Sequence, residues 1–258
     1  MDNNSIIIGL DLSLEHFGMV ALNAEGQAFH CSYMYPAQKY VLAIEKFMSF
    51  PCRGWLTLKK NEGEGRDFHT IRRIDSASTI IENAITNITQ LRPWYVAIED
   101  YAIGAAFSGS TGLIQIAEMT GVVKHWIYMN GGAIRTYDPS TVKLYATGKG
   151  NALKRHVIEA VEKEGFKLPP EMFKAVNKIW QGKPDKEFDG PGSDLCDAYT
   201  LARMLWTELQ VRAGKIELKD LPEHIREKIF FRVTKANPVN ILAREFIKRK
   251  VGTRTTES

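Results

Sequence analysis

Two apolar runs that each end in a carboxylate constrain the fold of this chain most. Ile6–Leu10 is followed by Asp11, and Trp94–Ile98 is followed by Glu99, with Asp100 as an alternative to Glu99. Such runs are typical of buried strands in a parallel sheet. The carboxyl ends of neighbouring parallel strands open on the same edge of a sheet. The sequence therefore predicts an α/β fold with an acidic site at one sheet edge.

The rest of the pattern predicts how that sheet is completed. Strands at 18–22 and 27–33 flank a turn of Asn, Ala, Glu and Gly, which predicts an antiparallel hairpin. Helical spacing predicts helices at 76–91, 113–128, about 154–164 and 193–213, and a further strand at 133–137. We therefore expect a mixed five-stranded sheet, an antiparallel hairpin plus parallel strands, flanked by helices. Residues 36–74 are expected to be a partly ordered insertion, and residues 166–192 to be rich in loops.

Length and charge predict one domain with an appendage. The chain has 258 residues and a net charge of +4. Residues 215–258 carry a net charge of +5, whereas residues 1–214 carry −1. We interpret 215–258 as a basic C-terminal extension with two short helical patterns, 222–231 and 238–250. A basic surface suits a polyanion, although a solvated tail would have the same composition.

Cysteine usage and hydropathy indicate a cytoplasmic protein. Cys31, Cys52 and Cys196 are an odd number without metal-ligand spacing, and we expect them to be reduced thiols. The N-terminus has neither the basic nor the apolar region of a signal peptide. The apolar runs are far shorter than the roughly 20 residues that span a bilayer, so no membrane partner is expected.

A second pair of carboxylates adds to the predicted acidic site. Asp194 and Asp197 are spaced i and i+3 on one predicted helix and so lie on one face of it. Carboxylate oxygens are ligands for Mg²⁺ and Mn²⁺, and two such ions can flank one phosphodiester. Each residue also has an ordinary explanation: Asp11 in a turn with Ser13, Glu99 paired with a lysine, and Asp194 at a favourable helix start.

The motifs, taken in order, resemble those of RuvC resolvases. Ile8-Gly9-Leu10-Asp11-Leu12-Ser13, with Gly18 after it, resembles the first strand of that family, and Ala97-Ile98-Glu99 resembles its second acidic strand. Residues 146–154 are similar to its TGxGxAxK loop, and Asp194-Leu195-Cys196-Asp197-Ala198 resembles its final DxxDA helix. The resemblance covers roughly residues 5–210.

The resemblance implies an RNase H-like fold over residues 1–214, with the insertion at 36–74, and a homodimer. It implies an endonuclease that uses Mg²⁺, or Mn²⁺ in its place, with two ions per site, to cut four-way DNA junctions. Its catalytic and metal-binding residues would be Asp11, Glu99, Asp194 and Asp197. A chain elongated in this way resembles variants carried by bacterial viruses, which would act in the cytoplasm of the bacterial host.

Several basic and aromatic residues are candidate DNA contacts. Lys149 and Lys154 flank a glycine turn at a helix start, which favours a phosphate, and Lys143 lies just before it. Tyr101 and Phe107 follow Glu99 and suit base stacking, or core packing. The extension adds four further candidates, Arg244, Lys248, Arg249 and Lys250.

Other functions remain open at this point. The same chemistry would suit a nuclease for flaps, Y-branches or RNA–DNA hybrids, and a catalytically silent DNA-binding scaffold would share the basic patches. An actin-like or Hsp70-like ATP-binding fold is not favoured, because residues 11–15 lack the glycine-rich phosphate loop that such folds place after the first strand.

Overall fold

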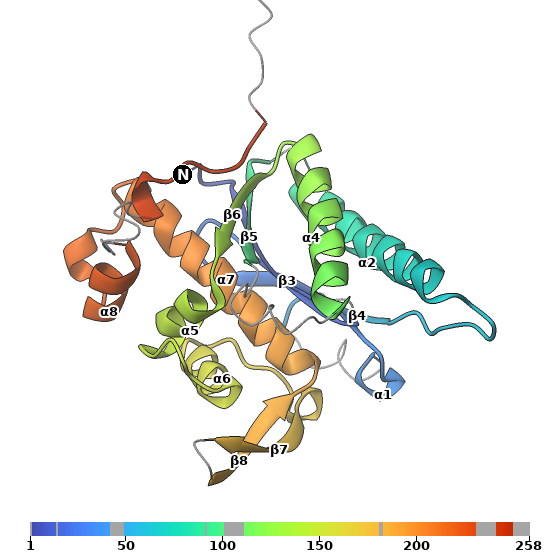
Figure 1. Ribbon diagram of the computed structural model, residues 1–258. Helices are drawn as coiled ribbons and strands as arrows, with labels where there is room; N and C mark the ends of the chain where they lie inside the picture. The colour runs from blue at the N-terminus through green and yellow to red at the C-terminus, as the bar shows by residue number, and fades with distance from the viewer. Residues whose placement is uncertain are drawn as a thin grey trace, which may run out of the picture.

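The computed structural model describes residues 2–13, 15–41, 49–90, 92–100, 111–180, 183–230 and 241–249. Its centre is a six-stranded sheet in the order β4-β3-β2-β1-β5-β6 (Figure 1). The strands are β1 (Ile6–Leu12), β2 (Phe17–Leu22), β3 (Ala28–Tyr35), β4 (Cys52–Leu56), β5 (Trp94–Glu99) and β6 (Ala133–Tyr137). β1, β2 and β3 pair antiparallel, whereas β5 runs parallel to β1 and β6 parallel to β5. The predicted mixed sheet, an antiparallel hairpin plus parallel strands flanked by helices, is confirmed, with β4 as an additional strand parallel to β3.

Helices cover both faces of the sheet (Figure 1). The helices α2 (Arg66–Thr89) and α4 (Thr111–Met129) lie on one face, and α5 (Pro139–Thr147), α6 (Lys154–Lys163) and α7 (Pro191–Arg212) lie on the other. α1 (Gln38–Val41) and α8 (Glu223–Ile225) are short, and α8 continues into a π-helical turn at Arg226–Phe230. None of the described helices has both the length and the apolar character needed to cross a membrane.

Alternation along β1 separates the two cores. Ile6, Ile8 and Leu10 pack on the α2 and α4 side, whereas Ile7 packs with α7. Successive side chains of a strand point to opposite faces of the sheet. An uninterrupted apolar run therefore packs side chains into the cores on both faces.

Two glycines let α7 lie directly on the sheet. A Cβ atom on Gly9 of β1 would lie 1.9 Å from the carbonyl oxygen of Ala198. A Cβ atom on Gly18 of β2 would lie 2.4 Å from the carbonyl oxygen of Asp194. The helix backbone therefore occupies the space that side chains would take, and this close contact fixes the first turns of α7 against β1 and β2.

Two predictions for this part of the chain were wrong because its proline and glycine residues were interpreted as a loop. Residues 166–192 are not mainly loop, since β7 (Lys174–Trp180) and β8 (Lys183–Asp189) form an antiparallel hairpin. α7 begins at Pro191 after Gly190, not at Ser193. Proline and glycine in this stretch suggested loop, although Pro184 is accommodated in a two-stranded sheet that has only edge strands.

The insertion at 36–74 is more ordered than expected. β4 lies within it, and α2 begins at Arg66, ten residues before the predicted start at 76. β4 is short and largely exposed, so it lacks the apolar run that marks a buried strand. The short helix expected at residues 40–49 falls mainly on residues 42–48, outside the described part of the chain.

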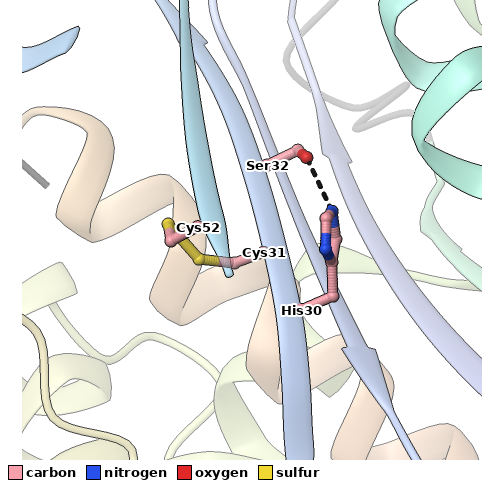
Figure 2. Close-up of a disulfide and its surroundings, with 4 residues drawn as sticks. All are labelled: His30, Cys31, Ser32 and Cys52. Atoms are coloured by element: carbon pink, nitrogen blue, oxygen red, sulfur yellow. Dashed lines mark hydrogen bonds between the residues drawn. A yellow bond between two sulfur atoms is a disulfide. The ribbon is translucent and has the colours of Figure 1, made fainter. Parts of the chain in front are cut away.

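The expectation that all cysteines are reduced was wrong. Cys31 of β3 and Cys52 of β4 form a disulfide, as Figure 2 shows, and only Cys196 is a free thiol. The two cysteines lie opposite one another in the parallel register, with a Cα–Cα distance of 4.5 Å. Spacing in the sequence could not reveal this pairing, because β4 itself was not predicted.

Described parts of the C-terminal extension pack onto the body of the protein. Ile225, Ile229 and Phe230 are buried in the same core as α7. Further on, Ile247 forms an antiparallel bridge with Ile134 of β6. Only a 3-10 turn at Ile241–Ala243 is found where a helix was expected at 238–250, of which 238–240 and 250 lie outside the described residues.

A buried ion pair helps to hold residues 241–249 against the sheet. Arg135 of β6 donates to Glu208 of α7 at 2.7 Å and to the carbonyl oxygens of Arg244 and Glu245 at 2.8 and 3.2 Å. The Arg135 guanidinium also lies 4.3 Å from the ring centroid of Phe246. The segment 241–249 is therefore a strap across the β6 edge of the sheet.

Substituting Gly9 should test the close contact between α7 and β1. We expect Gly9→Ala to lower the free energy of unfolding by at least about 2 kcal/mol, because the new methyl group meets helix backbone that cannot rotate away. Gly121→Ala is the matched control: Gly121 is exposed within α4 with no atom near its missing Cβ, so alanine there should stabilise by about 1 kcal/mol. Chemical denaturation measures both, and an unchanged Gly9→Ala protein would contradict the proposed packing.

Candidate active site

The strand-end carboxylates predicted from the sequence lie side by side. β1 and β5 are parallel neighbours, with Leu10 opposite Ile98, so Asp11 and Glu99 follow at the same sheet edge. Asp11 is partly buried, and its pKa is raised well above the ordinary value by desolvation and by the charges of Asp197, Glu99 and Asp194. Carboxylates from three distant stretches of sequence therefore act on Asp11.

The contact between α7 and the sheet brings in the second pair. Asp194 lies in the first turn of α7, is 1% exposed, and its backbone packs against Gly18, the register partner of Asp11. Asp197 lies one turn further along and is the largest charge acting on both Asp11 and Glu99. The i, i+3 spacing thus places both aspartates on the face of α7 that looks toward the strand ends.

Glu99, and not Asp100, belongs to this cluster. Burial and the charge of Asp197 raise the pKa of Glu99 to about 7. Asp100 is exposed, and it is not among the charges that act on Asp11. The structure therefore favours Glu99 over Asp100 as the member of the predicted acidic site.

Lys154 is the cation of the cluster. Its Nζ atom donates to Ser193 Oγ at 3.2 Å and lies 3.8 Å from Asp194 Oδ1. Burial lowers the pKa of Lys154, but the carboxylates of Asp197, Asp194 and Asp11 outweigh it, so the pKa is raised. The lysine predicted to contact phosphate therefore offsets part of the repulsion among the acids.

Sequence reasoning missed two residues at this site. His16, in the turn between β1 and β2, has its Nδ1 atom 2.9 Å from Asp194 Oδ2. Burial lowers the pKa of His16, but the Asp194 carboxylate outweighs it and the net pKa is raised. Asp189, at the end of β8, acts on His16 and Lys154. Neither residue stands in a motif, and Asp189 lies in a stretch that was read as loop.

Helix α5 and the loop that follows it each contribute one more lysine near this site. Lys143 lies close enough to Glu99 to lower its pKa. Thr147 closes the loop by donating to the Lys143 carbonyl at 2.8 Å, and Gly148 ends α5 with φ 75°. Lys149 is exposed on this loop. Basic groups therefore border the carboxylates on the side of the α6 N-terminus.

The basic residues of the extension lie away from the carboxylates. Lys248 borders a cavity of about 360 Å³, lined by Trp94, Ala133 and Arg212, at the starts of β5 and β6. Asp194 and Arg212 are at opposite ends of α7, roughly 27 Å apart along the helix. Arg244 and Arg249 are exposed in the same strap. Tyr101, Phe107 and Lys250 are outside the described residues.

The donor set fits hard divalent cations. It offers carboxylate oxygens, as suits Mg²⁺ or Mn²⁺, and one of them, Asp194 Oδ2, is buried 2.9 Å from His16 Nδ1. Among the described residues, however, no three acidic, histidine or cysteine side chains are drawn together around one point. The ligand roles of Asp11, Glu99, Asp194 and Asp197 therefore stay a prediction that the electrostatic coupling supports.

Comparison with known proteins shows which proteins this chain resembles. A curated protein from Prochlorococcus marinus subsp. pastoris, named crossover junction endodeoxyribonuclease RuvC, is 32% identical over 117 residues. The match covers 45% of this chain and 66% of the relative, so the chain spans about two thirds of the relative's length. Over this stretch the chain is similar to RuvC. No protein-family model matches the chain.

Two solved structures of RuvC from Thermus thermophilus are also similar. The protein alone is 19% identical with a TM-score of 0.48, and the alignment covers 81% of this chain and 96% of that one. The same protein in complex with Holliday junction substrate is 17% identical with a TM-score of 0.48, covering 82% and 97%.

The coupled carboxylates predict how stability depends on pH. The folded pKa of Glu99, about 7, exceeds its ordinary value of 4.5, so the folded state holds this proton more tightly than the unfolded state. In the absence of divalent ions, stability should therefore fall as pH rises from about 4.5 to about 7, by on the order of 3 kcal/mol at most.

Glu99→Gln tests this expectation because it removes the titrating group. Its stability in EDTA should fall less across this pH window than that of the wild type, as measured by urea unfolding at several pH values. Glu118→Gln, at an exposed position of α4, is the control and should follow the wild type. Parallel curves for wild type and Glu99→Gln would count against the coupling.

Proposed function

We propose that this RuvC-like protein is a divalent-metal-dependent endonuclease that cuts branched DNA, with four-way junctions as its main substrate. The observation that supports the proposal is the position of Asp11 and Glu99 at the ends of neighbouring parallel strands, where the charges of Glu99, Asp194 and Asp197 raise the pKa of Asp11 and the charge of Asp197 raises that of Glu99. Such buried repulsion is unfavourable for folding, and cations are the partners that would relieve it.

The metal-holding residues would be these four carboxylates, with Mg²⁺ as the ion, Mn²⁺ as a substitute and two ions per site. Bound ions would supply positive charge for the phosphodiester and lower the pKa of the attacking water. The Lys154 ammonium, already held between Ser193 and Asp194, supplies a fixed charge at the same place.

The bordering lysines would orient the DNA backbone. Lys149 and Lys154 flank the start of α6, where backbone N–H groups and the helix dipole favour a phosphate. Lys143 is adjacent to Glu99 and adds a third positive charge. Arg244, Lys248 and Arg249 would contact DNA arms further from the cut, because they lie toward the other end of α7. Salt-sensitive binding is expected from such contacts.

Cleavage of a synthetic junction tests the proposal. With Mg²⁺, the wild type should cut a labelled four-way junction in preference to a linear duplex of the same sequence. Asp11→Asn should bind the junction but cut it roughly 100-fold or more slowly, because the variant keeps the shape and loses a ligand charge worth several kcal/mol in the transition state.

Each alternative corresponds to a distinct result. Preferred cutting of a flap, a Y-branch or an RNA–DNA hybrid would change the substrate and keep the nuclease. Tight binding without cutting in Mg²⁺ or Mn²⁺ would indicate a non-catalytic scaffold. Equal cutting by wild type and Asp11→Asn would refute the role of Asp11.

We also propose that the protein is a homodimer. Phe68, Ile71 and Ile114 are 65%, 61% and 63% exposed on α2 and α4, and such a patch of apolar side chains suits a second copy of the chain. Light scattering should give the mass of two chains for the wild type and of one chain for Ile71→Glu. A single-chain mass for the wild type would contradict the dimer.

A further inference from the structure

The turn that carries His16 is held rigid by its own hydrogen bonds. Ser13 donates to the His16 carbonyl oxygen through its backbone N–H at 3.0 Å and through its hydroxyl at 2.8 Å. The backbone N–H of His16 donates back to Ser13 Oγ at 3.2 Å. The backbone of His16 therefore has a defined position just beyond the end of β1, close to Asp11.

The imidazole ring is held between a carboxylate and an aromatic ring. Its Nδ1 atom lies 2.9 Å from Asp194 Oδ2, and its ring centroid lies 5.8 Å from that of Tyr35 on β3. The other oxygen of Asp194, Oδ1, lies 3.8 Å from Lys154 Nζ and 3.4 Å from Ser193 Oγ. The two Asp194 oxygens thus have different neighbours, and His16 determines which way Oδ2 faces.

The insertion at 36–74 holds this turn from outside. Thr57, which directly follows β4, donates from its hydroxyl to the carbonyl oxygen of Glu15 and from its backbone N–H to the Tyr35 carbonyl at 3.2 Å. Arg73 of α2 lies 3.2 Å from the Glu15 carboxylate. β4 is itself joined to β3 by the disulfide of Cys31 and Cys52 (Figure 2).

We propose that His16 is a positioning residue that orients Asp194 for metal binding, and that the insertion braces the turn that carries it. The inference rests on the proposed function and assigns the insertion a role in the same site. Groups that hydrogen-bond a metal ligand fix its direction, and their loss typically weakens metal affinity or activity by about 10-fold to 100-fold. His16 acts through Asp194 and contributes no step to the reaction itself.

Binding of Mn²⁺ to the protein alone, measured by titration calorimetry, tests the proposal without DNA. We expect His16→Ala to weaken Mn²⁺ binding by about 10-fold or more. His16→Asn should restore most of the affinity, because the asparagine amide nitrogen takes the place of Nδ1. His16→Gln should restore less, because its amide lies where Nε2 was. His125→Ala, at an exposed position of α4, is the control and should bind as the wild type does.

A second measurement separates positioning from a structural role. In junction cleavage, His16→Ala should need more Mn²⁺ for half-maximal rate, while junction affinity in EDTA and the thermal melting of the asparagine variant stay at the wild-type level. Thr57→Val should shift the Mn²⁺ requirement in the same direction by a smaller factor, because it loosens the turn and leaves His16 in place.

The outcomes are distinct. Wild-type Mn²⁺ affinity in His16→Ala, or equal loss in the alanine and asparagine variants, would overturn the positioning role. An unchanged Thr57→Val protein would overturn the bracing role of the insertion. If the wild type binds Mn²⁺ with this dependence on His16 but cuts no DNA, the proposed function fails and the positioning of Asp194 stands.

Discussion

The site depends on the contact between the backbone of α7 and strands β1 and β2. Gly9 and Gly18 leave no side chain between the sheet and Ala198 or Asp194, so the helix lies as close as main-chain atoms allow. A helix further from the sheet would carry Asp194 and Asp197 away from the end of β1. The glycines next to the first acidic strand are therefore part of the acidic site, although neither carries a functional group.

The same contact concentrates negative charge in a buried place. The pKa of Asp11 and that of Glu99 are both raised, because burial and like charges act in the same direction. Lys154 and His16 lie on opposite oxygens of Asp194 and offset part of this cost. A cluster of this kind lowers the stability of the folded protein. Such a loss is expected at a site whose function is to bind cations.

Prediction from the sequence succeeded where a signal is local and failed where a contact is distant. The apolar strands ending at Asp11 and Glu99 could be read directly, as could the i, i+3 spacing of Asp194 and Asp197. β4 was missed because it is short and largely exposed, and the β7–β8 hairpin was missed because its sequence contains no apolar run. The disulfide of Cys31 with Cys52 depends on the pairing of β3 with β4, and His16 carries no motif at all.

The sequence by itself determined the periodicity of the strands and helices, the order of the motifs and the three stretches that carry the candidate carboxylates, because each of these depends on residues that are close along the chain. Only the tertiary structure decided that Glu99 and not Asp100 joins the cluster, that Lys154 lies among the acids and that His16 faces Asp194. Those relations depend on the close packing of α7 on β1 and β2 and on the position of the insertion, which bring together residues far apart in sequence.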